Sequence, residues 1–367
     1  MSGNRLKRRV QEILSLADVE IDGPRPWDIT VHDEGVYARV LRQGSIGLGE
    51  SYMDGSWDCP ALDQFFCKLF LAGVERRAAR SWPAIGLFLK SLLFNRQTKS
   101  RSTKVAQDHY DLGNDLFQCM LDRRMVYTCG KWGNAGNLNE AQEAKLDFVC
   151  QQLKLAPGMK VLDIGCGWGS FAKFAAEKYG VQAIGITLSR QQLELGQSLC
   201  SGLPVELRLE DYRDLHGSFD CVVSLGMFEH VGSQNYRTFF NVAHRALREA
   251  GHLFLATIGS NTSVRMTDPW IERYIFPNSH VPSTTQIETA LRGRFRVQEW
   301  QNWGPDYDRT LMAWFHNVET NWDRLKAKYS ERFHRMWKFY LLASAGSFRS
   351  HSLQVWQISL SRDGGAR

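Results

Sequence analysis

Apolar residues in the middle of the chain occur in short runs that alternate with segments of helical spacing. Runs at residues 161–164, 182–186, 205–209 and 219–224 predict buried parallel strands, because strands covered on both faces read as nearly continuous apolar sequence. Between the first two runs, residues 170–179 carry aromatic and alanine side chains at helical spacing. This alternation of strand and helix predicts a doubly wound α/β sheet.

Three later runs extend the predicted sheet to seven strands. One covers residues 252–258, and a final hairpin covers 296–300 and 354–361. Two aromatic-rich segments, 262–283 and 307–348, fall outside this sheet. Aromatic side chains belong to a core more often than to a pocket wall, but the sheet is complete without these segments. We therefore expect them to roof a substrate site.

The first 74 residues have a different pattern, which predicts a small mixed α/β domain. Residues 4–14 show an apolar stripe at helical spacing, and residues 62–70 indicate a second helix. Short strands are expected at 29–31 and 36–41, with a turn-rich stretch at 47–59. No group of catalytic side chains stands out here, so we expect a structural or substrate-presenting role.

A strongly basic stretch follows this domain. Residues 76–104 contain eight lysines and arginines and no acid, interleaved with apolar residues. This pattern fits a solvated linker, and it also fits a cationic amphipathic surface that meets anionic phospholipid headgroups. No nucleic-acid-binding motif accompanies the charge, so nucleic acid is not expected as a partner. The expected domains are a lipid-binding domain at 1–94, a linker at 95–106 and a catalytic domain at 107–367.

Composition narrows the class of protein. The 367 residues are 43% hydrophobic and 23% charged, which is an ordinary globular composition. The eight cysteines form no C-x-x-C pair, which predicts reduced thiols and no bound metal. The basic N-terminus lacks the apolar run of a signal peptide, and no run approaches the roughly 20 apolar residues of a membrane span. We expect a cytoplasmic protein.

A glycine-rich turn follows the first strand of the predicted sheet. The sequence VLDIGCGWGS at 161–170 joins a strand to a helix, as in nucleotide-binding βα units. Its Asp163, two residues before Gly165, and its G-C-G-W-G spacing resemble the first motif of S-adenosylmethionine-dependent methyltransferases. That ligand has no phosphate, so its methionine part would lie on the turn. Asp163 would help to hold the ammonium group by a charge-assisted hydrogen bond.

The ends of the next strands carry further candidate ligand contacts. A carboxylate commonly binds the ribose hydroxyls after the second strand, but Thr187 stands there, so Gln192 is the better candidate. After the third strand, Asp211 can accept from the adenine amino group and Tyr212 can stack on the ring, although acids at such positions also serve as helix caps. After the fourth strand comes Glu229 with His230, at an edge where open α/β sheets bind ligands.

Seven motifs then identify a family resemblance. The sequences YTCG, VLDIGCGWGS, TLSRQQ, EDYRDL, GMFEHVG, DPWIERYIFPN and DYDRTLMAW occur in the order and spacing of the cyclopropane-fatty-acyl-phospholipid and mycolic acid cyclopropane synthases. With the N-terminal GLGESYMDG segment, which the shorter mycolic acid enzymes lack, the resemblance covers nearly the whole chain. It implies a class I methyltransferase fold, with a Rossmann-like seven-stranded sheet, helical lipid-site insertions and a small N-terminal α/β domain.

The resemblance also implies an activity. It is the transfer of a methylene group from S-adenosylmethionine to the cis double bond of an unsaturated acyl chain in a membrane phospholipid. A homodimer bound peripherally at the inner membrane surface is expected. The motifs and the resemblance together predict that these residues contact S-adenosylmethionine: Tyr127, Thr128, Asp163, Gly165, Cys166, Gly167, Trp168, Gly169, Thr187, Leu188, Gln192, Asp211 and Tyr212.

The expected reaction also needs a base, which in the family is thought to be bicarbonate held by a Cys, a Glu, a His, an Ile and a Tyr. Four of these match Cys129, Glu229, Ile258 and Tyr307, whereas the family's histidine is replaced by Ala256. The resemblance thus implies a bicarbonate site that has lost one partner. His230 and His280 are candidate replacements, although each also fits a structural role.

Two questions stay open at this point. The base is either bound bicarbonate or Glu229 itself, acting directly or through water. Because the base decides how the carbocation on the acyl chain resolves, the product is either a cyclopropane ring or a methyl or methylene branch. A third hypothesis is a lipid-binding homologue without catalysis, which the intact cofactor motifs disfavour.

Overall fold

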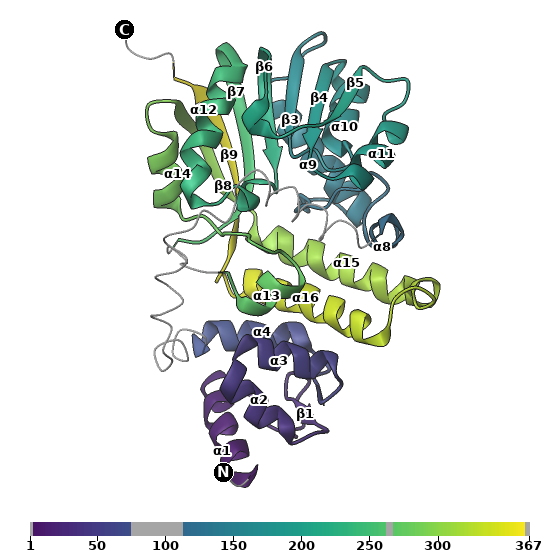
Figure 1. The fold of residues 1–367 in the computed structure, drawn as a ribbon, viewed down its shortest axis with the longest axis vertical. Coiled ribbons are helices and arrows are strands. Elements are labelled where there is room, and N and C mark those ends of the chain that lie inside the picture. The colour runs from purple at the N-terminus through teal and green to yellow at the C-terminus, as the bar shows by residue number, and fades with distance from the viewer. Residues whose placement is uncertain (1–2, 75–112, 262–266, 364–367) are drawn as a thin grey trace. The chain divides into compact units, whose positions relative to one another are not determined.

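The computed structural model describes residues 3–74, 113–261 and 267–363 (Figure 1). The chain divides into two compact units. The first comprises Met1–Phe94, Asp268–Ile275 and Tyr307–Leu353, and the second comprises Asn95–Thr267, Phe276–Asp306 and Gln354–Arg367. The expected linker at 95–106 and the whole basic stretch at 76–104 lie outside the described residues.

The division differs from the domain boundaries expected from the sequence. The expected catalytic domain at 107–367 is continuous, whereas the units group two of its segments with the N-terminal residues. Both segments belong to the aromatic-rich insertions. The role of these insertions as a roof over the substrate site stays a prediction.

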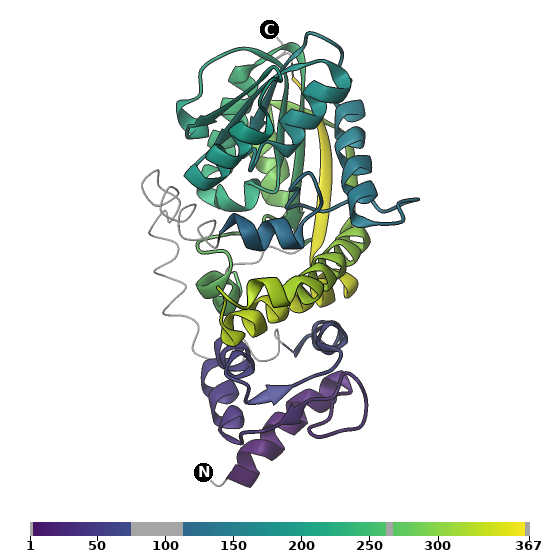
Figure 2. The same cartoon turned by 90° about the vertical axis from the view of Figure 1, so that its right-hand side faces the viewer.

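A seven-stranded sheet forms the second unit, with the order β5-β4-β3-β6-β7-β9-β8. Five neighbouring strands, from β5 to β7, are parallel, and β9 pairs antiparallel with both β7 and β8. Figure 2 shows the C-terminal strand β9 in yellow. The strands are β3 (Lys160–Ile164), β4 (Gln182–Thr187), β5 (Val205–Leu209), β6 (Phe219–Leu225), β7 (Leu247–Gly259), β8 (Phe295–Asn302) and β9 (Gln354–Arg362). The predicted class I methyltransferase sheet is confirmed.

Helices cover both faces of this sheet (Figure 1). They are α9 (Leu138–Gln152), α10 (Ser170–Tyr179), α11 (Arg190–Leu199), α12 (Tyr236–Ala246) and α14 (Thr284–Leu291). The short helix α8 (Asn114–Met120) precedes them in the chain. Three short 3-10 helices follow strands or loops near the site, namely η2 (Tyr212–Asp214), η3 (Phe228–His230) and η4 (Ser233–Asn235).

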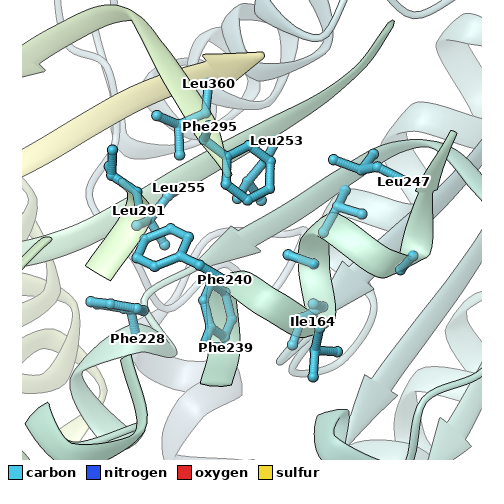
Figure 3. Close-up of a cluster of buried hydrophobic side chains, with 14 of the residues drawn as sticks. Ile164, Phe228, Phe239, Phe240, Leu247, Leu253, Leu255, Leu291, Phe295 and Leu360 are labelled. Atoms are coloured by element: carbon cyan, nitrogen blue, oxygen red, sulfur yellow. The ribbon is translucent and has the colours of Figure 1, made fainter. Parts of the chain in front are cut away.

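The alternation of side chains along β3 builds two separate cores. Leu162 and Ile164 pack on one face with aromatic residues of α12 and with α14, as Figure 3 shows for Phe239, Phe240 and Leu291. Val161 packs on the other face, against α9 and α10. Successive strand residues point to opposite faces, so Asp163 shares the face of Val161 and lies on the side of α9. This register decides which helix supplies side chains to the carboxylate.

The first unit is largely helical. Its elements are α1 (Gly3–Leu14), η1 (Ser15–Ala17), β1 (Thr30–Val31), α2 (Gly35–Gln43), α3 (Ser45–Met53), β2 (Trp57–Asp58), α4 (Leu62–Leu71), α13 (Pro269–Tyr274), α15 (Gly304–Leu325) and α16 (Glu331–Arg349). The helices expected at 4–14 and 62–70 are confirmed. The strand expected at 36–41 is wrong, because these residues lie within α2. The stretch at 47–59 is also more regular than expected, since it contains the end of α3 and all of β2.

The error at 36–41 has a simple cause. Its β-branched and aromatic residues favour a strand by intrinsic propensity, but the adjacent Val36 and Tyr37 are both buried. Adjacent buried residues are not compatible with a strand that has one exposed face, and they suit one stripe of a helix. The burial of this stripe outweighs local propensity.

Acids of the N-terminal segment form ion pairs within the first unit. Glu50 accepts hydrogen bonds from Arg39 at 2.7 Å and from the hydroxyl of Tyr274 on α13 at 2.7 Å. Asp58 accepts from Arg335 of α16 at 2.7 Å, and the same guanidinium donates to the Trp57 carbonyl at 2.9 Å. Glu50 of the GLGESYMDG segment therefore holds insertion helix α13, and Asp58, which follows the segment, holds α16, both through charged contacts.

Candidate active site

A cavity opens at the carboxyl ends of β3, β4, β5 and β6, where ligands of open α/β sheets bind. Twelve of the thirteen residues predicted to contact S-adenosylmethionine line it. The exception is Gly169, which faces Leu207 and Cys200 instead. The predicted residues in the lining are Tyr127, Thr128, Asp163, Gly165, Cys166, Gly167, Trp168, Thr187, Leu188, Gln192, Asp211 and Tyr212.

The glycine turn forms one wall of this cavity. Gly165 has a φ of +82°, and a Cβ there would lie 2.5 Å from the Cβ of Met227, another lining residue. Only glycine combines this backbone conformation with such a close approach. The amides of Gly165 and Cys166 both donate to the Ile186 carbonyl, at 2.9 and 3.0 Å. These two amides therefore bond to the neighbouring strand β4 and do not donate to a ligand in the cavity.

Two opposite charges are buried at the cavity. Asp163 is 2% exposed, and burial raises its pKa to about 7, against the influence of the nearby Lys145 ammonium. Lys145 comes from α9, is also 2% exposed, and has its pKa lowered by burial to about 8. Its Nζ donates to the Thr128 hydroxyl at 3.0 Å. Both residues line the cavity, so a ligand there meets an anion and a cation.

The other predicted nucleoside contacts are held by local hydrogen bonds. The Thr187 hydroxyl donates to Gln192 Oε1 at 3.1 Å, which leaves the amide Nε2 nearest to the glycine turn at Gly167. Asp211 caps η2 and accepts from the Arg213 side chain at 2.6 and 2.8 Å. Asp211 therefore fits both roles expected from the sequence, since it caps a helix and also lines the cavity.

Glu229 is a buried carboxylate that precedes the lining residue His230 in sequence and is not itself part of the cavity lining. It lies on η3, just after β6, and its Oε1 accepts from the Ile258 amide at 2.6 Å. Its Oε2 is buried and has no hydrogen-bond partner among the described residues. Burial raises the pKa of Glu229 to about 7, although the Ile258 amide favours the ionised form. An unpaired buried acceptor is costly, so this atom is poised to accept a proton or a donor group.

The three positions linked to the missing family histidine differ in what they offer. Ala256 is 7% exposed and packs in the apolar core beside α9 and α10. His280 is engaged already, since its Nδ1 pairs with the Tyr236 hydroxyl at 3.0 Å. His230 lines the cavity, and burial lowers its pKa to about 4, so its ring is neutral at physiological pH.

The remaining two predicted base residues, Cys129 and Tyr307, belong to different units of the chain. The Cys129 thiol donates to the Gly130 carbonyl at 3.2 Å and lies 3.6 Å from the Trp303 carbonyl. Tyr307 belongs to the first unit, where its ring packs against Trp314 and Phe348. Their part in the reaction stays a prediction.

Several residues of the cavity wall escaped the sequence analysis. They are Lys145, Arg213, Met227, Pro277 and Asn278, among others. Lys145 carried a usable signal, because it falls on the apolar face of its helix with Ala141, Leu146 and Val149. A lysine on a buried helix face is rare unless it is paired. The others lie within motifs already quoted, namely EDYRDL, GMFEHVG and DPWIERYIFPN, but the sequence analysis did not single them out as contacts.

The chain is similar in sequence to known lipid-modifying enzymes. The family model for mycolic acid cyclopropane synthetase matches residues 97–358. Cyclopropane-fatty-acyl-phospholipid synthase of Escherichia coli K12 is 48% identical over 97% of this chain and 93% of its own length. Tuberculostearic acid methyltransferase UfaA1 of Mycobacterium tuberculosis is 33% identical over 98% of this chain and 91% of its own.

A solved structure agrees with these sequence relatives. The mycolic acid cyclopropane synthase CmaA1, solved as a complex with SAH and CTAB, is 32% identical, with a TM-score of 0.66. It covers 71% of this chain, and the alignment spans 98% of that protein. The extent of the family match and the identity over nearly the full length both exceed what a shared fold alone would give. The chain belongs to the mycolic acid cyclopropane synthetase family of S-adenosylmethionine-dependent methyltransferases.

Proposed function

We propose that this enzyme transfers a methylene group from S-adenosylmethionine to the cis double bond of unsaturated acyl chains in membrane phospholipids. The observation that carries the proposal is the buried carboxylate of Glu229, whose Oε2 has no hydrogen-bond partner among the described residues. The next residue in the sequence, His230, lines the cavity. A base such as Glu229 is required to remove a methyl proton after carbon–carbon bond formation. A plain nucleotide-binding site has no need of one.

The residues of the cavity fit the methyl donor. Asp163 offers a buried carboxylate to an ammonium group, Gln192 offers its amide to the ribose hydroxyls, and Tyr212 offers an aromatic face to adenine. Asp211 also lines the cavity, where its carboxylate would accept from the adenine amino group. When bound, S-adenosylmethionine supplies an electrophilic methyl group.

The protein's own residues have a limited task in this reaction. An alkene is a weak nucleophile, so the site must hold it in line with the methyl group, which is the contribution of orientation to catalysis. No activated nucleophile is needed. We propose that Glu229 Oε2 takes the proton released as the ring closes, while the Ile258 amide fixes the carboxylate through Oε1.

The residues present fit bicarbonate poorly, which favours Glu229 itself as the base. Ala256 offers no polar group in place of the family's histidine, and the Ile258 amide is already bonded to Glu229. The test is turnover of unsaturated phospholipid vesicles in buffer stripped of carbon dioxide, read by mass spectrometry of the acyl chains. Full activity there supports Glu229, and activity that returns only on adding bicarbonate overturns this assignment.

The pH dependence of turnover provides a second test of Glu229. Because its pKa is raised to about 7, the carboxylate is protonated below that pH and loses its function as a base. We expect kcat at saturating donor to rise with pH and to level off above about pH 7. His230 stays neutral across this range. A profile already flat from pH 5 would contradict the role of Glu229.

We also propose that the protein docks on anionic membrane surfaces, as a homodimer. Among the described residues, no helix is long and apolar enough to cross a bilayer. A groove between α1 and α2 is lined by Arg5, Arg8, Arg9 and Arg42, with Glu12 as the acid in its lining. Each basic side chain near an anionic bilayer contributes about 1 kcal/mol of attraction. These arginines support the docking proposal independently of the basic stretch at 76–104.

Vesicle sedimentation tests the docking proposal. Replacing Arg5, Arg8 and Arg9 together by glutamine should weaken binding to vesicles rich in phosphatidylglycerol at least about tenfold. Binding of the unaltered protein should fall as salt shortens the Debye length from about 30 Å to about 8 Å. Neutral phosphatidylcholine vesicles serve as the control. Unchanged binding of the triple variant would remove α1 from the docking surface, and light scattering of the protein alone tests the dimer.

A further inference from the structure

The charge pair at the donor cavity has an unusual arrangement. Lys145 and Asp163 are each 2% exposed and line the same cavity, yet no direct ion pair joins them in the part of the chain that the structure describes. Each influences the other electrostatically. Burying two charges that do not touch is expensive unless other groups satisfy them. We therefore expect a ligand in the cavity to supply an opposite charge to each of these two side chains.

The other groups around the pair do not fill this role. Asp122 also faces Lys145, but its carboxylate already accepts from the amides of Val126 and Arg124 at 2.8 and 2.9 Å. The remaining groups that face Lys145 are the thiols of Cys129 and Cys150. The carboxylate of Asp163 accepts no hydrogen bond from the described residues. It is thus an unpartnered, buried group on the cavity wall.

Lys145 itself retains capacity to bind. An ammonium group has three N–H donors, and the structure uses one of them, for the Thr128 hydroxyl at 3.0 Å. The Thr128 carbonyl is held separately, by the amide of Gln142 at 2.7 Å. The backbone of this segment is therefore fixed without Lys145. Two donors of the ammonium remain beside the cavity.

We propose that Lys145 binds the α-carboxylate of the methyl donor while Asp163 binds its α-ammonium. The pair then forms a receptor for the zwitterionic end of an amino acid, and both buried charges gain their partners when the donor binds. This inference rests on the proposed function, because it assumes that the cavity holds S-adenosylmethionine. It adds a specificity-determining residue that no sequence motif indicated, on a helix outside the glycine turn.

The inference predicts how the site discriminates between ligands. S-adenosylhomocysteine keeps both charged groups, whereas its decarboxylated analogue keeps the ammonium and loses the carboxylate. A hydrogen bond to a charged group contributes enough to change affinity by about 30-fold. We expect the unaltered protein to bind S-adenosylhomocysteine about 30-fold more tightly than the analogue, by isothermal titration calorimetry. Equal affinities would overturn the proposal without any variant.

A single variant then assigns the preference to Lys145. In Lys145→Met, which removes the charge and shortens the unbranched side chain by one atom, the two ligands should bind with affinities within about threefold of each other. Lys178→Met, which removes an exposed lysine from α10, is the matched control and should keep the full preference. If Lys145→Met weakens both ligands equally, the lysine acts only on the structure of the cavity and the proposal is wrong.

A second variant separates carboxylate binding from the contact with Thr128. Thr128→Val removes the hydroxyl that Lys145 holds. Because Thr128 itself lines the cavity, we expect this variant to weaken both ligands alike and to keep the ratio of their affinities. Loss of the preference in this variant would show that the lysine works through Thr128 instead. Failure of the unaltered protein to bind S-adenosylhomocysteine at all would count against the proposed function, and so against this inference too.

Discussion

Replacing Glu229 by glutamine is expected to lower kcat on unsaturated phospholipid about a thousandfold, within the range that a general base contributes. Glutamine keeps the size of the side chain and an oxygen for the Ile258 amide, which now donates to Glu229 Oε1 at 2.6 Å. It removes the acceptor for the methyl proton. Binding of S-adenosylhomocysteine should stay within about twofold, because Glu229 is not among the residues that line the donor cavity.

The matched control is Glu249→Gln, which makes the same change at an exposed position on β7. It should leave kcat unaltered. Turnover by Glu229→Gln within about tenfold of the unaltered enzyme would show that another group takes the proton. If donor binding fell as strongly as kcat, Glu229 would instead be a structural residue, since a lost base lowers the rate without lowering donor affinity.

Replacing Gly165 by alanine should weaken S-adenosylhomocysteine binding about 100-fold, or roughly 2.7 kcal/mol. Two effects combine at this position. A φ of +82° is strained for any residue with a Cβ, at a cost of about 1–2 kcal/mol. The added methyl would also lie 2.5 Å from the Met227 Cβ, so the turn or Met227 must move. Gly165 and Met227 both line the cavity, so a movement of either residue distorts the donor site.

Gly158→Ala isolates the first of these effects. Gly158 has a φ of +84°, close to that of Gly165, but a Cβ there would meet nothing within 4 Å. It precedes β3 and is not in the cavity lining. This variant should lose stability in a thermal melt by a similar strain cost and bind the donor normally. Equal donor binding by the Gly158 and Gly165 variants would show that contact with Met227 is unimportant for the cavity.

The strands of the sheet were predictable because burial on both faces leaves a pattern within each short segment of sequence. Strands buried on both faces must be apolar along their length, so the runs at β3, β4 and β6 were visible without any knowledge of their neighbours. The segment 36–41 shows the opposite case. Its β-branched residues favour a strand, and only its packing within the first unit makes it part of α2.

The candidate site was predictable only where a residue sits in a motif. Asp163 and the glycine turn follow from their place at the end of a strand. The contact between Glu229 and the Ile258 amide depends on β6 and β7 being neighbours in the sheet, which sequence spacing alone does not fix. Lys145 reaches Thr128 from a helix that precedes the whole sheet. Its role follows from burial, which no short motif encodes.

The central claim is that this enzyme closes a ring with Glu229 as base, and the fate of the donor's methyl hydrogens tests it most directly. Unsaturated phospholipid vesicles are incubated with the protein and methyl-trideuterated S-adenosylmethionine, and the acyl chains are analysed by mass spectrometry. We predict a product that gains one carbon, keeps two of the three deuterons and resists mild hydrogenation. A methyl-branched product that keeps all three deuterons, and retains a double bond because the proton is lost from the acyl chain instead, would contradict ring closure and place the enzyme with the branch-forming methyltransferases.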